Sequence, residues 1–452
     1  MTQHTTHVLA QLSALRADDR LAAARQLVEA QPGLLDDSAL GDEVNNHVHT
    51  IFSFSPYNPT QVALAAKQAG LRAVGSVDHD SIAAAEEMLE AGRIFRIATT
   101  VGFELRIGFR GTPFETRRLN NPDVEGSAYV LAHGVPRRYI PEFESLLEPV
   151  RRARRIRNAK QVERLNARLS SAGLDELSYE KDVEAQSQVH NGGTVTERHI
   201  LYALSISLTE RFGKGQQLAD LLRERLGIPL SGSIAERLAD PENPHYVYDV
   251  LGALKAELVP AFFIQPDEQE SIPVEHFLAI VNRTPAIPAY AYLGDVAASP
   301  TGDKKAQTFE DAYLDELFQF IADIGFQAVT YMPPRNTVEQ LERVSERART
   351  LGLMEISGVD INSSRQSFNC PEVLQPEFRH LIESTWALIA HEKLSHIDDS
   401  YGLFSAGSPF AAESLEDRIA RYAAIGRAMD PADPWNIAVD GPHISIQGKR
   451  IS

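Results

Sequence analysis

The sequence predicts an α/β fold, namely a distorted (β/α)₇ TIM-like barrel with a helical insertion and helical N- and C-terminal extensions. Short β-type runs alternate with amphipathic helical runs from Glu43 onward, which is typical of parallel βα units. The alternation stops at residue 140, where a long helical pattern begins, and it resumes after residue 256. Helical patterns outside the alternation mark the two extensions.

The 452 residues therefore divide into five segments. The N-terminal helical extension covers residues 1–42, and its helical pattern stops at Pro32-Gly33. The barrel is expected in two parts, 43–139 and 257–371, on either side of a mainly helical insertion, 140–256. Residues 372–452 form the C-terminal extension, with one amphipathic helix followed by turn-rich sequence.

The strands and helices of the barrel follow from the alternation. In the first part we expect strands over 43–50, 73–77, 97–107 and 127–134, and helices over 59–69 and 81–91. In the second part we expect strands over 258–264, 286–292, 328–332 and 355–361, and helices over 309–324 and 338–351. Between the two parts, the insertion begins with a basic run, 151–157, which we interpret as the solvated face of a helix.

Composition and charge narrow the function classes. The residues are 43% hydrophobic and 23% charged, which is ordinary for a globular protein. Cys370 is the one cysteine, so neither an intramolecular disulfide nor a cysteine zinc cluster can form, and a reducing, cytoplasmic location is expected. The net charge of −18 repels nucleic-acid backbones and anionic membranes. No run approaches the ~20 apolar residues that span a bilayer, and no secretory signal is seen. Oligomeric state is not predicted.

Ionisable side chains close three successive predicted strands. His47 and His49 lie two residues apart, so on a strand both imidazoles point to the same face. His79 closes the next strand and Glu104 the third, at the carboxyl ends where barrel enzymes place their sites. Imidazole and carboxylate are common metal ligands, so the recurrence predicts a metal site. Each motif alone is equally typical of surface histidines or a salt bridge.

Two aspartates flank His79. Asp78 or Asp80 can orient a metal-bound imidazole through a hydrogen bond. The alternative for Asp80 is capping of the following helix.

The ordered motifs resemble the PHP (polymerase and histidinol phosphatase) superfamily. NHVHT at 46–50, SVDHD at 76–80 and VGFEL at 101–105 match its HxHT, DHD and GxE strand ends. Weaker similarities are GTVTERHI at 193–200, which resembles the R-x-H-I segment of PHP phosphoesterases, and SGVDIN at 357–362, which resembles the closing D-x-H. The resemblance implies a distorted (β/α)₇ barrel, two or three divalent ions and phosphoester hydrolysis.

Carried over by motif, the resemblance implies metal ligands at His47, His49, His79, Glu104, Asp360 and His133. Tyr129 is the rival of His133, because residues 129, 131 and 133 share one face of a strand. His199 is a candidate for the metal or for the substrate phosphate. Asn362 and Tyr292 stand where the family has histidines, so we expect one to three ions of zinc, manganese or iron, with fewer favoured by these departures.

Polar groups near the expected mouth indicate an anionic substrate. Arg335, Arg365 and Lys304 follow predicted strands, and a guanidinium binds phosphate or carboxylate with two parallel hydrogen bonds. Surface salt bridges are the alternative. With Asn362 and Tyr292, these three residues form the predicted substrate set, and Asp78, Asp80, His199 and Arg365 form the predicted catalytic set.

The first functional hypothesis is metal-dependent hydrolysis of a small phosphorylated substrate by a metal-activated water. A metal-dependent hydrolase or lyase acting on a carbonyl bond is the second hypothesis. A binding or regulatory protein on a degraded scaffold, without catalysis, is the third.

Overall fold

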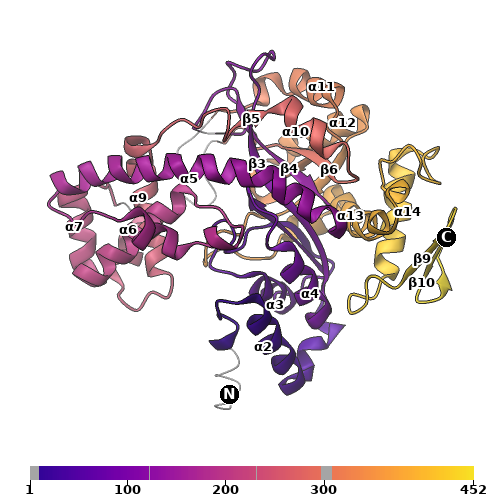
Figure 1. Cartoon of the computed structure of the whole chain (residues 1–452), viewed down its shortest axis with the longest axis horizontal. Coiled ribbons are helices and arrows are strands. Elements are labelled where there is room, and N and C mark those ends of the chain that lie inside the picture. The colour runs from indigo at the N-terminus through magenta and orange to yellow at the C-terminus, as the bar shows by residue number, and fades with distance from the viewer. Residues whose placement is uncertain (1–9, 122, 231, 297–307, 452) are drawn as a thin grey trace.

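A nearly closed, barrel-shaped sheet lies at the centre of the molecule (Figure 1). The structure is a computed structural model, and it describes residues 10–121, 123–230, 232–296 and 308–451. Seven strands follow one another around the sheet: β1 (Val44–Val48), β2 (Ala73–His79), β3 (Ala98–Gly108), β4 (Ser127–His133), β6 (Ile287–Ala291), β7 (Ala328–Tyr331) and β8 (Met354–Ser357). A parallel bridge between Val48 and Ile361 joins β1 to the segment after β8. The predicted distorted TIM-like barrel with helical extensions is therefore confirmed.

One strand runs against the direction expected. The sequence pattern suggested parallel βα units throughout, but β4 pairs antiparallel with both β3 and β6. The reason is that β3 and β4 are joined without a helix, and an intervening helix is the usual means of returning the chain for a parallel pair. The first residues of β4 therefore lie at the same edge as the last residues of β2 and β3.

Helices cover the outside of the barrel. They are α3 (Pro59–Gln68), α4 (Ala85–Phe95), α10 (Val274–Val281), α11 (Leu314–Ile324) and α12 (Val338–Leu351), and the two-residue strand β5 (Ile272–Pro273) pairs with β3. α3 begins with a capping box in which Asn58 and Gln61 exchange hydrogen bonds. The buried side chains of these helices join the strands in one continuous hydrophobic core.

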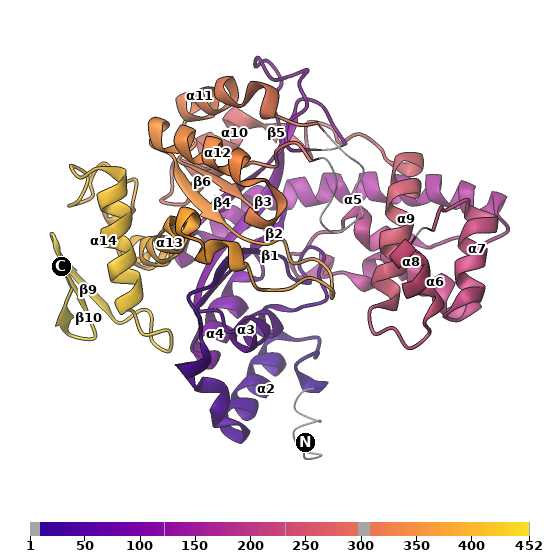
Figure 2. The same ribbon diagram turned by 180° about the vertical axis from the view of Figure 1, so that it is seen from behind.

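The insertion forms a helical lobe on one side of the barrel, and it has a hydrophobic core of its own (Figure 2). Its helices are α5 (Ile140–Ser171), α6 (Glu197–Phe212), α7 (Gln216–Leu226), α8 (Gly232–Ala239) and α9 (Tyr246–Phe262). The strand expected over 258–264 is wrong, because α9 continues to Phe262. Val250, Leu254, Leu258 and Phe262 recur every four residues and are buried on one face of that helix.

The basic run of α5 is a solvated face only in part, since Arg152 and Arg155 are exposed. Arg151, Arg154 and Arg157 are buried, and they follow one another at intervals of three, so they line one side of the helix. Arg154 pairs with Asp80 of the barrel, and Arg157 pairs with Glu270 at 2.5 Å. The buried cations are therefore matched by carboxylates, and these pairs attach the insertion to the barrel.

The terminal extensions pack on the barrel. α2 (Ala17–Ala30) lies against α4, where Nε of Arg20 donates to Glu87 at 2.9 Å. The C-terminal segment holds α13 (His380–Ile397), α14 (Leu415–Ala428) and a small sheet of β9 (Ile437–Asp440), β10 (His443–Ile446) and β11 (Lys449–Arg450). α13 is buried on all sides over 384–395 rather than amphipathic, and its Glu392 accepts from Thr100 of β3 at 2.7 Å. Among the described residues, no helix has the length and apolar character needed to cross a membrane.

Candidate metal centre

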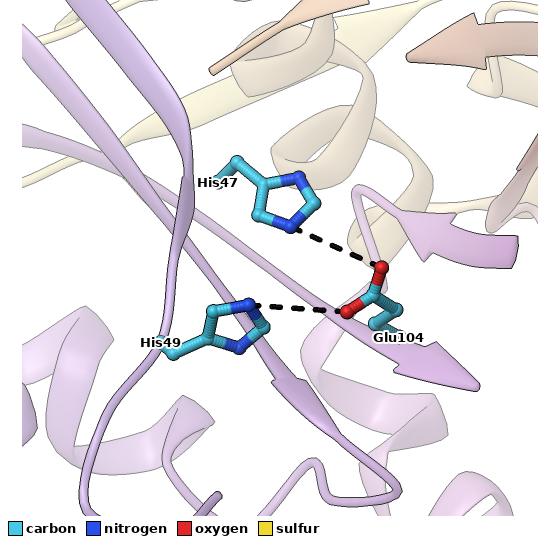
Figure 3. A group of neighbouring side chains, drawn as sticks. All are labelled: His47, His49 and Glu104. Atoms are coloured by element: carbon cyan, nitrogen blue, oxygen red, sulfur yellow. Dashed lines mark ion pairs between the residues drawn. The ribbon is translucent and has the colours of Figure 1, made fainter. Parts of the chain in front are cut away.

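Three side chains converge at the carboxyl ends of β1 and β3 (Figure 3). One nitrogen or oxygen atom from each of His47, His49 and Glu104 lies within 4.8 Å of the other two. Nε2 of His47 is 4.0 Å from Oε1 of Glu104, and Nε2 of His49 is 3.8 Å from Oε2. All three side chains are buried. A Glu104 oxygen thus faces each imidazole without a direct hydrogen bond to either.

Two further side chains from the predicted ligand set reach the same group. Nδ1 of His79 lies 2.8 Å from Oε2 of Glu104, and its ring stacks on that of His49 with centroids 4.5 Å apart. Oδ1 of Asp360 lies 3.3 Å from Nε2 of His49. The structure therefore brings together His47, His49, His79, Glu104 and Asp360, which we call the five-residue cluster.

The register of the strands places these side chains. His79 is directly opposite Glu104 in the parallel pair of β2 and β3, so both point to the barrel interior. The pairing of β1 with β2 is irregular between Asn45 and Val48, the stretch that contains His47. Gly358 lets the last strand approach, because a Cβ there would lie 2.4 Å from the backbone nitrogen of His47.

Burial keeps the imidazoles of His49 and His79 neutral, and the pKa values of the two carboxylates move in opposite directions. Burial lowers the pKa of His49 to about 3 and that of His79 to about 4. Burial also raises the pKa of Glu104. For Asp360 burial acts upward as well, but the nearby His49, His47 and Arg198 bring its pKa down to about 2. At neutral pH His49 and His79 are thus neutral bases, the form of imidazole that can bind a metal ion, rather than cations.

A divalent cation fits the cluster. In tetrahedral sites the ligand atoms lie about 2.0–2.2 Å from zinc, which places them roughly 3.3–3.6 Å from one another. The separations of 3.3 and 3.8 Å around His49 are close to this spacing. Moreover, the buried Nδ1 of His79 has no aligned hydrogen-bond partner although Glu104 is near. A bound cation would give this buried nitrogen a partner, and its 2.8 Å separation from Glu104 is shorter than the spacing of two ligands on one tetrahedral zinc.

β4 contributes Tyr129 to the mouth and His133 to the interior. Leu131 lies opposite Glu104, and the antiparallel direction puts Tyr129 further out and His133 further in. The Tyr129 ring centre is 5.5 Å from that of His79, and its hydroxyl oxygen accepts from Arg106 at 2.8 Å. Burial and His47 lower the pKa of His133 to about 3, and its Nε2 has no hydrogen-bond partner among the described residues. Ligation by His133 stays a prediction.

The two aspartates that flank His79 have different partners. Asp78 is buried on the other face of β2, where Thr50 and Ser53 of the loop after β1 donate to it. Asp80, with a left-handed φ of 52°, pairs with Arg154 of α5. Neither carboxylate belongs to the group of three that could hold a metal ion.

In the insertion, His199 and its neighbour Arg198 lie on the first turn of α6. Nδ1 of His199 accepts from the backbone of Thr196 at 3.0 Å, and its ring contacts Phe54 edge-on. Burial, with Arg154, lowers the pKa of His199 to about 3. Arg198, which the sequence reasoning missed, is half-buried and close enough to Asp360 to lower its pKa. Its place beside His199 in the segment already singled out was the available signal.

The predicted substrate set is dispersed. Arg365 makes two hydrogen bonds to Asp249 of α9, at 2.7 and 2.6 Å, which attach the loop after β8 to the insertion. Nε of Arg335 donates to the carbonyl of Leu293 at 3.3 Å. The hydroxyl of Tyr292 donates to Asp311 at 2.6 Å, and its ring packs on Phe318 of α11, outside the barrel. Lys304 lies outside the described residues.

Asn362 contacts one member of the five-residue cluster, Asp360. Its Nδ2 lies 2.6 Å from both carboxylate oxygens of Asp360. The amide therefore donates to Asp360, whereas a histidine at this position could offer a ring nitrogen to the ion.

Comparison with known proteins adds two structures of low identity. No protein-family model matches the sequence, and no curated protein matches it. A structure described as a proposed metal-dependent phosphoesterase from Bifidobacterium adolescentis has a TM-score of 0.47 and 19% identity, covering 75% of this chain and 96% of its own. An amidohydrolase from Chromobacterium violaceum, solved with bound sulfate and no metal, has a TM-score of 0.47 and 14% identity, covering 76% and 96%. These values carry no functional argument, so we argue function from the residues of this chain.

Proposed function

We propose that this protein is a metal-dependent hydrolase that cleaves a small phosphoester. The observation that carries the proposal is the five-residue cluster, in which imidazole nitrogens and two carboxylates face one another across 2.8–4.0 Å. The resemblance of the motifs at 46–50, 76–80 and 101–105 to the PHP superfamily supports phosphoester chemistry over other hydrolytic chemistry.

The donor set suits zinc, manganese or iron. Imidazole nitrogens with carboxylate oxygens are ligands for all three metals, whereas magnesium and calcium prefer oxygen alone. We propose one or two ions held by His47, His49, His79, Glu104 and Asp360, with His133 as a further candidate. A bound divalent ion supplies a nucleophile by lowering the pKa of water, and it offsets negative charge on the substrate.

The other residues hold this cluster in place and receive the substrate. Asn362 fixes the direction of the Asp360 carboxylate by donating to both of its oxygens at 2.6 Å. The Arg198 side chain makes no hydrogen bond or ion pair with any residue that the structure describes, so its guanidinium remains available to an anionic group near Asp360. We propose that Arg198 binds the substrate phosphate. The predicted roles of Arg335 and Lys304 remain open.

The net charge of the chain limits which kinds of anionic substrate the protein can attract. A net charge of −18 opposes long-range attraction of polyanions, so a small anionic substrate that meets a local guanidinium is favoured over a nucleic acid. The same argument opposes binding to an anionic membrane surface.

The test is release of phosphate from a panel of small phosphoesters by protein reconstituted with manganese or zinc. We expect activity that a stringent chelator abolishes and that His47→Ala and Glu104→Ala lose. His380→Ala, which alters a partly exposed histidine on α13 outside the cluster, is the matched control and keeps activity.

A parallel panel of carboxylic esters and amides distinguishes hydrolysis of a carbonyl bond from hydrolysis of a phosphoester. Turnover of that panel alone replaces the phosphoester proposal, and activity that survives both the chelator and the two variants contradicts any metal-dependent reaction. Absence of bound metal, together with no thermal shift on addition of manganese or zinc, favours a binding protein.

A further inference from the structure

The loop after β1 is held by one buried carboxylate. Asp78 accepts three hydrogen bonds from it: from the backbone nitrogen of Thr50 at 2.6 Å, from the Thr50 hydroxyl at 2.7 Å and from the Ser53 hydroxyl at 2.6 Å. Asp78 is 1% exposed and Ser53 is fully buried. The Ser53 oxygen also lies 3.4 Å from Nδ1 of His49. Asp78, Ser53 and His49 therefore form a chain that leads from β2 to the five-residue cluster.

We infer that Ser53 and Asp78 are positioning residues that fix the tautomer of His49, so that its bare Nε2 faces Glu104 and Asp360. The inference rests on the proposed function, because a divalent cation is the partner that this bare nitrogen needs. Ser53 belongs to none of the residue sets predicted from the sequence.

The tautomer follows from counting protons. A serine hydroxyl has one proton, and Ser53 directs it to Asp78, whose carboxylate also accepts two hydrogen bonds from Thr50. The Ser53 oxygen can therefore only accept from His49. Nδ1 of His49 must then carry the ring proton, and Nε2 keeps its lone pair.

At the other side of the ring, this lone pair meets oxygen atoms. Nε2 lies 3.3 Å from Oδ1 of Asp360 and 3.8 Å from Oε2 of Glu104. A bare nitrogen beside two carboxylates is repelled by them, whereas all three atoms bind a cation placed between them. The hydrogen bond at Nδ1 thus prepares His49 for metal binding and disfavours the tautomer that would place a proton at the site.

The insertion contributes to the same arrangement. The backbone nitrogen of Thr194 donates to the carbonyl of Phe52 at 2.8 Å, and Phe54 packs against His199 of α6. Ser53 lies between these two contacts in the chain. The loop is consequently held from the barrel by Asp78 and from the insertion by Thr194, which limits the positions that the Ser53 hydroxyl can adopt.

The direct test observes the ring nitrogens. Metal-free protein labelled with ¹⁵N at histidine is examined by long-range ¹H–¹⁵N NMR, and the His49 signals are assigned by their loss in His49→Gln. We expect a protonated Nδ1 and a bare Nε2 in the wild type, and a shift toward the other tautomer in Ser53→Ala. A bare Nδ1 in the wild type overturns the inference.

The second test measures zinc affinity by calorimetry. Loss of a hydrogen bond to the ring nitrogen of a histidine ligand that faces away from the metal weakens metal binding by about 10- to 100-fold. We therefore expect Ser53→Ala to lose zinc affinity by a factor of this size. Ser53→Thr keeps the hydroxyl and is expected to restore binding. Ser55→Ala is the matched control, because Ser55 lies in the same loop and its hydroxyl accepts from the backbone of Tyr57.

The outcomes separate this inference from the proposed function. A wild type that binds no metal contradicts the proposed function itself. A wild type that binds zinc, together with a folded Ser53→Ala variant of equal affinity, leaves the metal site standing and overturns the role of Ser53. Recovery in Ser53→Thr with no change in Ser55→Ala supports it, since a merely structural loss would not depend on the hydroxyl.

Discussion

Nε2 of His49 and Oδ1 of Asp360 lie 3.3 Å apart across the line where the barrel closes. His49 follows β1, the first strand of the sheet, and Asp360 follows β8, the last. The bridge between Val48 and Ile361 joins the same two segments one residue away from each. The cluster therefore takes shape only when the first and last strands meet, and its geometry depends on that junction.

Gly358→Ala is expected to disturb this junction. The new Cβ would lie 2.4 Å from the backbone nitrogen and 2.5 Å from Cβ of His47, so one of the two strands must shift. We expect destabilisation of about 1–3 kcal/mol in urea unfolding, with weaker zinc binding by calorimetry. Gly252→Ala is the control, since nothing lies within 4 Å of a Cβ there and α9 should become more stable by up to about 1 kcal/mol. Unchanged zinc affinity in Gly358→Ala would contradict the prediction.

Glu104→Gln is expected to separate metal binding from stability. The change keeps the shape of the side chain and removes a carboxylate whose pKa burial already raises. We expect loss of bound metal by elemental analysis, but a metal-free free energy of unfolding equal to or above that of the wild type. Glu355→Gln is the control. Glu355 is also buried, but Tyr331 and Ser345 donate to it and it lies outside the cluster, so metal content should not change. Stoichiometric metal in Glu104→Gln would refute the role of Glu104.

Stability of the metal-free protein is expected to fall in mild acid. Burial is the main cause that lowers the pKa of five histidines: to about 3 for His49, His133 and His199, and to about 4 for His79 and His391. The unfolded chain takes up these protons as the pH falls below about 6.5, whereas the folded chain does not. The stability that is present above pH 6.5 is therefore lost as the pH falls towards 4, by up to about 1.4 kcal/mol per pH unit for each proton.

Urea unfolding between pH 4.5 and 7.5, in the presence of a chelator, measures this slope. His391→Gln is the informative variant, because His391 lies on α13, where it accepts from the backbone of Leu403 at 2.9 Å and is not part of the cluster. Its slope should be smaller by the contribution of one proton. A free energy of unfolding that stays level across the range would show that the histidines are protonated in the folded state.

Local patterns predicted the strands and the residues at their ends, because both depend on neighbours in the chain. His47, His49, His79 and Glu104 come together in the structure because each occupies the same edge of adjoining strands, a consequence of sheet geometry. The direction of β4 could not be predicted this way. Residues 129 and 133 share a face whether the strand runs up or down, so only the antiparallel pairing shows that Tyr129 is at the mouth.

Features that depend on distant partners were also missed. The apolar run 258–264 is too short for periodicity to separate a strand from the end of a buried helix. The basic run of α5 gave no sign of Asp80 or Glu270, which lie far away in the sequence and neutralise it. Similarly, Ser53 acquires its proposed role only through Asp78 and His49, which no spacing between these residues reveals.

Arg154→Met is expected to be the most destabilising single change at the junction of insertion and barrel. Arg154 is 3% exposed and pairs with Asp80, with Glu197 at 3.2 Å and with Glu270 at 3.8 Å. Its removal leaves the buried Asp80 carboxylate without a cation, whereas Glu197 and Glu270 keep Arg157, and breaking a buried ion pair typically costs about 3–5 kcal/mol. Urea unfolding measures the loss. Arg152→Met, two residues away on the same helix, removes only an exposed pair with Glu148 and should leave the free energy of unfolding nearly unchanged.

A double-mutant cycle shows that the partner is Asp80. Asp80→Asn in the Arg154→Met background removes the carboxylate that has lost its cation, so the double variant should be less destabilised than the sum of the two single variants, by about 0.5–3 kcal/mol. Strict additivity would mean that Arg154 acts through Glu197, Glu270 or packing rather than through Asp80. Because Asp80 directly follows His79, a positive coupling would also show that the insertion helps to hold the strand end that carries a predicted metal ligand.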